Sequence, residues 1–143
     1  MVTDADRDLL TAALKAQKRA HCPFSRYPVG AAVRTTSGEI FTGCNVESAS
    51  FSLTCCAERV AVFKAISEGH KQFVACSIVT VEGTPAPPCG ACRQVLYEFG
   101  PSMRIVLGNP EGDVRVLKLA DLFPEGFTSE QLLARSKAAK ELD

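Results

Sequence analysis

Histidine and surplus charge are both scarce in this chain. Its 143 residues include only two histidines, and neither His21 nor His70 stands at a ligand spacing from another metal-binding side chain. The formal net charge is zero, whereas proteins that bind nucleic acids usually present a basic stripe. We therefore expect neither a histidine-based metal site nor a nucleic-acid partner.

Long apolar runs and a targeting segment are also missing. The longest apolar stretches fall far short of the roughly 20 residues that a membrane-spanning helix needs, and no basic and apolar leader opens the sequence. The seven cysteines are an odd number, which argues against a disulfide framework and for a reducing compartment. These features predict a cytoplasmic protein with no membrane partner.

What the sequence does contain is a cysteine motif. Cys89 and Cys92 form a Cys-x-x-Cys pair, no second such pair exists, and Cys55 or Cys56 offers a third thiol. Structural zinc sites are closed by four protein ligands, whereas catalytic sites use three and leave one position open. The ligand count therefore favours a catalytic site with one Zn²⁺ per chain.

Both parts of this motif are predicted to open helices. Residues 57–68 and 89–99 have helical patterns that end at glycine, so the thiols fall at helix N-termini, which favour anions. Three thiolates give a zinc complex a charge of about −1, and Arg59 and Arg93 are placed to offset it from outside the ligand shell. Glu58 follows the first thiol on the same helical turn and is predicted to be a general acid and base.

Two other interpretations of the cysteines compete with this one. An intracellular Cys-x-x-Cys can be a redox pair, but that role leaves Cys56 and Glu58 unexplained. A structural zinc with Cys55 as fourth ligand is also conceivable. Adjacent residues of a helix point about 100° apart, however, so two neighbouring thiols rarely reach one metal without distortion.

Helical and strand patterns alternate along the chain and predict an α/β fold. The expected architecture is a three-layer α-β-α domain of residues 1–143, with a five-stranded mixed sheet between helices and the metal at the carboxyl ends of the strands. Strands are predicted at residues 29–34, 39–44, 73–81, 103–107 and 114–117, and helices at 3–20, 57–68, 89–99, 119–123 and 128–140.

Two further segments offer candidate substrate contacts. Asn45 and Glu47 alternate at the end of a predicted strand and so point to one side, next to the metal helix. An amide beside a carboxylate suits a pair of sugar hydroxyls, although a solvated strand end would look the same. Phe24, in a loop held by two prolines, is a candidate wall of a flat-ring pocket, or simply an aromatic that covers the core.

Together these motifs resemble the small nucleoside cytidine deaminases. The likeness rests on Cys-Ala-Glu at residues 56–58 and Pro-Cys-Gly-Ala-Cys at 88–92, and extends to segments 22–32, 43–47 and 122–127. It implies the cytidine deaminase fold and a hydrolase that converts cytidine and 2′-deoxycytidine to the uridines in pyrimidine salvage. In that mechanism zinc-bound hydroxide attacks C4 of the base while Glu58 carries protons.

The resemblance also assigns individual residues. It selects Cys56 as the third ligand with Cys89 and Cys92, and it implies a homotetramer of similar subunits. The chain departs from the family at Phe51, where a tyrosine is common, so any hydroxyl contact there is lost. The other implied roles are ribose binding by Asn45 and Glu47, pyrimidine contacts from Phe24 and the peptide groups of Ala57, a position for Arg59 behind the ligands, and insertion of Phe127 into a neighbouring subunit's site.

Two different functions remain as alternatives. The same fold could deaminate another heterocycle, such as a nucleoside antibiotic, a free base or a nucleotide. A zinc-stabilised binding or RNA-editing module without small-molecule activity is the other, and the absence of a basic patch argues against it.

Overall fold

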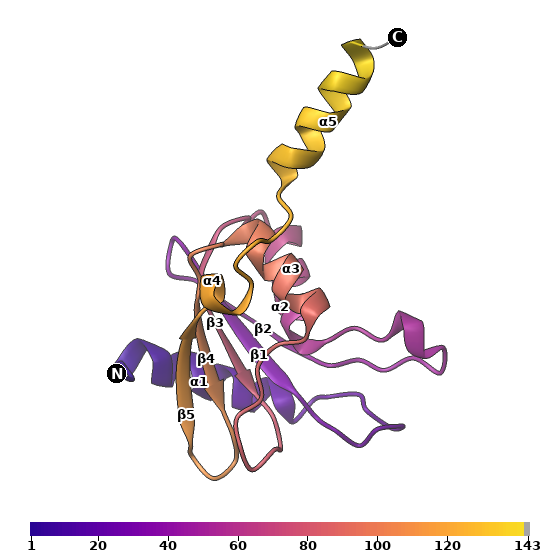
Figure 1. Ribbon diagram of the computed structural model, residues 1–143. Coiled ribbons are helices and arrows are strands. Elements are labelled where there is room, and N and C mark those ends of the chain that lie inside the picture. The colour runs from indigo at the N-terminus through magenta and orange to yellow at the C-terminus, as the bar shows by residue number, and fades with distance from the viewer. Residues whose placement is uncertain (142–143) are drawn as a thin grey trace.

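The computed structural model describes residues 1–141 and contains the expected three-layer α/β arrangement (Figure 1). A five-stranded mixed sheet has the strand order β2-β1-β3-β4-β5. The strands are β1 (Gly30–Thr35), β2 (Ile40–Cys44), β3 (Phe73–Val79), β4 (Arg104–Gly108) and β5 (Val114–Lys118). The helices are α1 (Asp4–Gln17), α2 (Ala57–Ser67), α3 (Gly90–Phe99), α4 (Leu119–Leu122) and α5 (Ser129–Glu141), with a short 3-10 turn, η1 (Phe51–Leu53).

The sheet combines hairpins with helical crossovers. β1 pairs antiparallel with both β2 and β3, β3 pairs parallel with β4, and β4 pairs antiparallel with β5. The crossovers through α2 and α3 therefore connect strands that run in one direction, with β1 inserted between β2 and β3. Because α2 and α3 each follow the carboxyl end of a strand, their N-termini meet at the same edge of the sheet.

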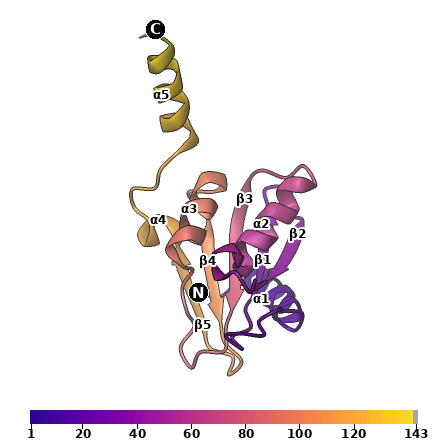
Figure 2. The same ribbon diagram turned by 90° about the vertical axis from the view of Figure 1, so that its right-hand side faces the viewer.

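Helices cover both faces of the sheet (Figure 2). α1 packs Leu9 and Ala13 against Ala32, Ala75 and Val79 on one face. The opposite face carries the larger core under α2 and α3, with alternate residues of β3 facing it. This larger cluster includes Ala61, Val62, Cys76, Ile78 and Leu96.

Two glycines let the helices approach the sheet closely. A Cβ on Gly30 would lie 1.9 Å from the carbonyl oxygen of Ala13 in α1, and one on Gly43 would lie 2.4 Å from that of Ala57 at the start of α2. No side chain fits in either place. The second contact fixes the first turn of α2 against the end of β2, which is where the predicted metal site begins.

The first helix is shorter than predicted. It begins at the expected Thr3, whose side chain and that of Asp6 form a capping box, but it ends at Gln17 rather than near residue 20. His21, which directly follows the predicted helix, lies outside the observed one. Its backbone N–H donates to Asn45 O at 2.9 Å and its carbonyl accepts from Glu47 N at 2.8 Å, so long-range pairing replaces the last helical turn.

The last helix stands apart from the rest of the molecule. α5 leads away from the body after a short linker, as both views show (Figures 1 and 2). Its leucines, Leu132 and Leu133, are exposed. Within residues 1–141, no helix combines the length and the apolar character needed to cross a membrane.

An ion pair between the buried Asp6 of α1 and the partly exposed Arg104 of β4 gives a prediction about stability. Both carboxylate oxygens of the buried Asp6 accept hydrogen bonds from Arg104, at 2.8 and 2.9 Å, and these bonds hold the pKa of Asp6 at about 2, below its ordinary value of 3.8. Asp6→Asn should therefore lower the free energy of unfolding by about 2 kcal/mol near neutral pH. Urea denaturation of the variant and the parent would measure this difference.

The pH dependence and a neighbouring carboxylate provide controls. Because the pKa of Asp6 is lower in the folded protein, its contribution to stability is present above about pH 4 and is lost as the pH falls toward 2. The free energies of unfolding of Asp6→Asn and the parent should therefore become equal in acid. Asp8→Asn, at an exposed position of the same helix, should leave stability nearly unchanged. Equal effects of the two substitutions would show that the ion pair contributes nothing.

Candidate metal centre

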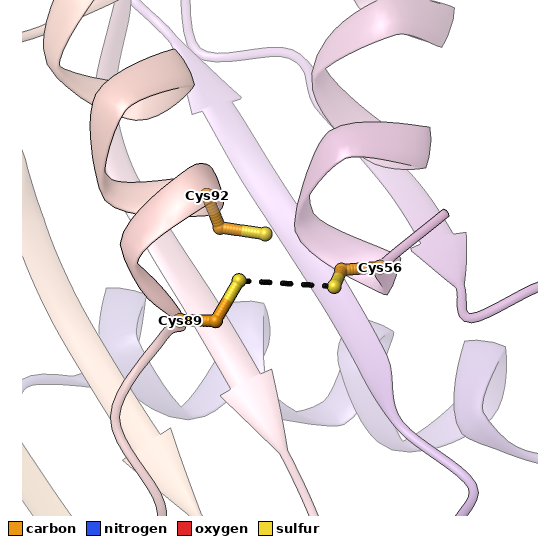
Figure 3. A group of neighbouring side chains, drawn as sticks. All are labelled: Cys56, Cys89 and Cys92. Carbon is orange, nitrogen blue, oxygen red and sulfur yellow. Dashed lines mark hydrogen bonds between the residues drawn. The ribbon is translucent and has the colours of Figure 1, made fainter. Parts of the chain in front are cut away.

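Three cysteine sulfurs from two helices point toward one another (Figure 3). Cys56 is the N-cap residue of α2, Cys89 is the N-cap residue of α3, and Cys92 lies in the first turn of α3. The Sγ atoms of Cys56 and Cys89 are 3.9 Å apart, and all three sulfurs lie within 4.8 Å of one another. The predicted ligand set is thus assembled from segments more than thirty residues apart.

The spacing of these sulfurs fits a tetrahedral zinc ion. A Zn–S bond of about 2.3 Å in tetrahedral geometry places neighbouring sulfurs about 3.8 Å apart, close to the observed 3.9 Å between Cys56 and Cys89. Three thiolates form one face of such a tetrahedron and leave the fourth corner free. The centre therefore suits one Zn²⁺ held by three protein ligands.

The fourth ligand of a structural site is not supplied by Cys55. Its backbone N–H and carbonyl pair with Val46 at 2.9 and 3.0 Å, and its sulfur is not part of the three-cysteine group. Burial raises the pKa of the Cys55 thiol, which disfavours the thiolate that a metal requires. This geometry favours the open site over the closed one.

One positive side chain, Arg59, contacts the Cys56 sulfur. Arg59 donates from Nη2 to Cys56 Sγ at 3.3 Å, as predicted for a residue behind the ligands. The adjacent Cys92 thiol, followed by Arg59, lowers the pKa of Cys56 to about 5 although burial opposes the change. Arg93 does not share this role, because its guanidinium donates to the carbonyl oxygens of Pro88 and Leu122. It braces the loop before α3 instead.

Glu58 is a buried carboxyl beside the ligands. Only 4% of the residue is exposed. Burial is the main cause that raises its pKa, and the negative Cys56 adds to the rise. A carboxyl group in such surroundings can hold a proton at a pH where an exposed glutamate cannot, which is the property that a general acid and base needs.

A cavity of about 360 Å³ opens in front of these residues. Cys56, Ala57, Glu58 and Cys89 line one side of it, and residues from segments 25–29, 45–54 and 78–87 complete the wall. The volume lies within the range of small-molecule pockets. Two thiol ligands and the buried carboxyl thus face a chamber large enough for a nucleoside-sized molecule.

Asn45 and Glu47 both line this cavity, as their alternation predicts. Asn45 accepts from Val29 N at 2.9 Å and donates to Tyr27 O at 2.8 Å. Glu47 Oε1 accepts from the backbone N–H groups of Phe24 and Ser25 at 3.0 and 3.1 Å. The two side chains therefore brace the loop before β1, a structural role that the sequence did not reveal.

The aromatic residue in the cavity wall is Tyr27, and the predicted contact of Phe24 with the pyrimidine remains a prediction. Phe24 is 50% exposed, packs its ring against Phe51 at a centroid distance of 5.5 Å, and is not among the lining residues. Tyr27 lines the cavity, and burial raises the pKa of its phenol. Ser25 and Val29 line it as well, but Arg26, between Ser25 and Tyr27, has a positive φ of 54°, so no regular strand alternation in the sequence identifies Tyr27.

Phe127 lies outside this cavity. It is 42% exposed, and its backbone N–H and carbonyl pair with the side chain of Gln94 at 3.3 and 2.8 Å. The side chain therefore stays at the surface of its own subunit, and its predicted place in a neighbouring site remains a prediction.

The adjacent cysteines provide a test of the ligand set. Cys56→Ser should abolish stoichiometric zinc binding, because two remaining thiolates no longer hold the ion against a chelator. Cys55→Ser should retain one zinc per chain. Metal analysis after dialysis against a weak chelator would distinguish them, and zinc loss from the Cys55 variant alone would reverse the assignment.

Comparison with known proteins agrees with this geometry. Residues 3–109 match the family model described as the cytidine and deoxycytidylate deaminase zinc-binding region. Cytidine deaminase of Halalkalibacterium halodurans is 44% identical over 87% of this chain and 95% of that protein, and cytidine deaminase of Mycobacterium tuberculosis is 40% identical over 90% and 95%. The crystal structure of cytidine deaminase from Burkholderia pseudomallei aligns with a TM-score of 0.83 and 45% identity over 88% of this chain and all of that one. This chain therefore belongs to the zinc-binding cytidine and deoxycytidylate deaminase family.

Proposed function

We propose that this protein catalyses the hydrolytic deamination of cytidine and 2′-deoxycytidine to uridine and 2′-deoxyuridine. The observation that carries the proposal is one cavity lined by two of the three clustered thiols, the buried Glu58, and the polar pair Asn45 and Glu47. Metal ligands, a proton carrier and groups able to hold a sugar thus face a single chamber. Relatives named cytidine deaminase support the choice of substrate.

The zinc ion would supply Lewis acidity that activates water for attack on C4 of the pyrimidine. Cys56, Cys89 and Cys92 would hold it. Arg59 holds the Cys56 sulfur by donating to it, and the helix N-termini offset the charge of the three thiolates.

Glu58 would carry protons between water and substrate. Zinc deaminases as a class use a glutamate that is not a ligand as general acid and base, and Glu58 follows the ligand Cys56 by two residues. Its raised pKa allows the carboxyl to accept the water proton and hold it out of bulk solvent. Donation to ring N3 and to the departing amine would complete the transfer.

Asn45 and Glu47 would hold the sugar hydroxyls. Asn45 uses one acceptor position and one amide N–H for the loop and keeps a second of each. Glu47 binds the loop through Oε1, the Ser25 side chain also acts on its carboxylate, and Oε2 would be the oxygen that holds the sugar. Ala57 backbone groups and the Tyr27 ring are placed to contact the base.

Replacement of the proton carrier tests the mechanism. Glu58→Gln should reduce kcat for cytidine by at least ~10²-fold, because an amide cannot exchange the proton. Zinc content should stay at one per chain, since Glu58 is not a ligand. The control is Glu68→Gln at an exposed position near the end of α2, which should keep parent activity. A zinc-loaded Glu58 variant with the parent's rate would remove Glu58 from the mechanism.

Substrate comparison separates the proposal from its alternatives. Ultraviolet assays with cytidine, CMP, cytosine and adenosine should show turnover of cytidine above the others, because Glu47 would repel a phosphate and a free base lacks the sugar. Binding of an RNA oligonucleotide at moderate salt without cytidine turnover would instead support the binding module.

We further propose a cytoplasmic homotetramer in which residues 1–143 form one domain. Exposed apolar side chains support the assembly, since Phe24, Phe51, Leu53 and Phe127 offer contacts for other subunits. All seven cysteines are free, which fits a reducing compartment. Sedimentation equilibrium should give a mass about four times the 15.3 kDa of the chain, and a monomer mass at micromolar concentration would contradict the assembly.

A further inference from the structure

Thr80 is a buried polar residue that the proposed reaction does not use. It directly follows β3, is only 4% exposed and lines the cavity. Within residues 1–141, no protein group stands in hydrogen-bond geometry to its Oγ1 atom, although the hydroxyl lies close enough to the Tyr27 phenol to oppose the rise in the pKa of that phenol. A buried hydroxyl without a partner lowers stability, so its presence in the cavity wall requires an explanation.

The hydroxyl faces the functional side of the sheet. Cys76 and Ile78 point toward α2 and α3, and Thr80 continues the same alternation. Its own backbone is satisfied, because the N–H donates to Gly108 O at 3.3 Å. The side chain is therefore held at the carboxyl end of β3, in the wall of the cavity.

Thr80 and Asn45 stand on opposite sides of the cavity floor. Val79 pairs with Gly30 and Gly30 pairs with Cys44, so the residues that follow β3 and β2 are separated by the start of β1. Two strand spacings correspond to about 10 Å, a distance that a nucleoside can bridge. With the sugar at Asn45 and Glu47, the Thr80 hydroxyl faces the other half of the molecule.

We propose that the Thr80 hydroxyl donates a hydrogen bond to a polar atom of the pyrimidine ring and thereby contributes to substrate specificity. This inference rests on the proposed nucleoside deaminase function. The bound base satisfies the hydroxyl that the protein leaves unpaired, so the cost in the free protein is recovered in the complex.

The isosteric variant Thr80→Val separates binding from folding. It keeps the shape and removes the hydroxyl, so KM for cytidine should rise about 5- to 10-fold, the loss expected for one neutral hydrogen bond. The inhibition constant of the product uridine should rise in parallel. 2′-Deoxycytidine should show the same rise, because the contact is to the base. Thr80→Ser retains a hydroxyl and should recover most of the affinity.

Thr80→Val should weaken substrate binding without lowering the stability of the protein. Thr35, a buried threonine whose hydroxyl is paired, provides the matched control. Thr80→Val removes an unpaired buried hydroxyl, so its thermal midpoint should equal or exceed that of the parent. The Thr35 hydroxyl, buried at the far end of β1, pairs with Ser37 Oγ at 2.9 Å and accepts from Glu39 N at 3.1 Å. Thr35→Val should lower the midpoint and leave KM unchanged.

Three results would overturn the inference. The first is a KM of Thr80→Val for cytidine equal to that of the parent, and the second is a rise in KM for cytidine but not for 2′-deoxycytidine. The third is a thermal midpoint of Thr80→Val lowered as in Thr35→Val, which would reveal a hydrogen-bond partner of Thr80 within the protein. Failure of the proposed function is distinct, because a zinc-loaded parent that turns over neither nucleoside removes both conclusions. An active parent with an unaffected Thr80 variant removes this one alone.

Discussion

The convergence of three sulfurs that would bind zinc as thiolates is the constraint on which this structure depends. Thiolates only a few ångströms apart repel one another, and a metal alone leaves them with net negative charge. Helix N-termini offset this repulsion, because Cys56 and Cys89 are the N-cap residues of α2 and α3 and Cys92 lies in the first turn of α3. Both helix N-termini must therefore meet at one point, and the crossovers β2-α2-β3 and β3-α3-β4 bring them there.

That requirement explains features remote from the metal. Gly43 has no side chain because Ala57 O at the start of α2 occupies the space, and a larger residue would push the first ligand away from the other two. Arg93 lies one residue beyond Cys92, yet it binds Pro88 and Leu122 and so fixes the approach to α3. Backbone packing positions these ligands as much as their sequence spacing does.

Local patterns were sufficient to predict much of the fold and the metal site. Capping at Thr3, the helices that start after Cys56 and Cys89, and the alternation of Asn45 and Glu47 all depend on residues close in sequence. The predictions that were wrong or incomplete depend on distant contacts. The first helix ends early where His21 pairs with residues 45–47. Tyr27 lines the cavity, and the loop that carries it is bound by the carboxylate of Glu47. Sequence spacing carries no information about such pairings.

Asn45 and Glu47 show how the site is prepared before a substrate arrives. Each side chain hydrogen-bonds the loop before β1 and also lines the cavity. The loop that carries Tyr27 is thus ordered by the same groups proposed to hold the sugar. Such sharing reduces the entropy that binding must remove, and it means that substitutions at either residue would disturb the loop as well as the sugar contacts.

The distribution of unpaired polar atoms supports a specialised cavity. Among the described residues, only two buried side-chain atoms lack a hydrogen-bond partner, Arg59 Nε and Thr80 Oγ1. The first belongs to the guanidinium that contacts Cys56, and the second lines the cavity. Elsewhere the buried polar groups are paired, as Asp6 and Thr35 illustrate. Since each unpaired group lowers stability, their confinement to this region indicates that the protein gives up stability where it must bind a metal and a substrate.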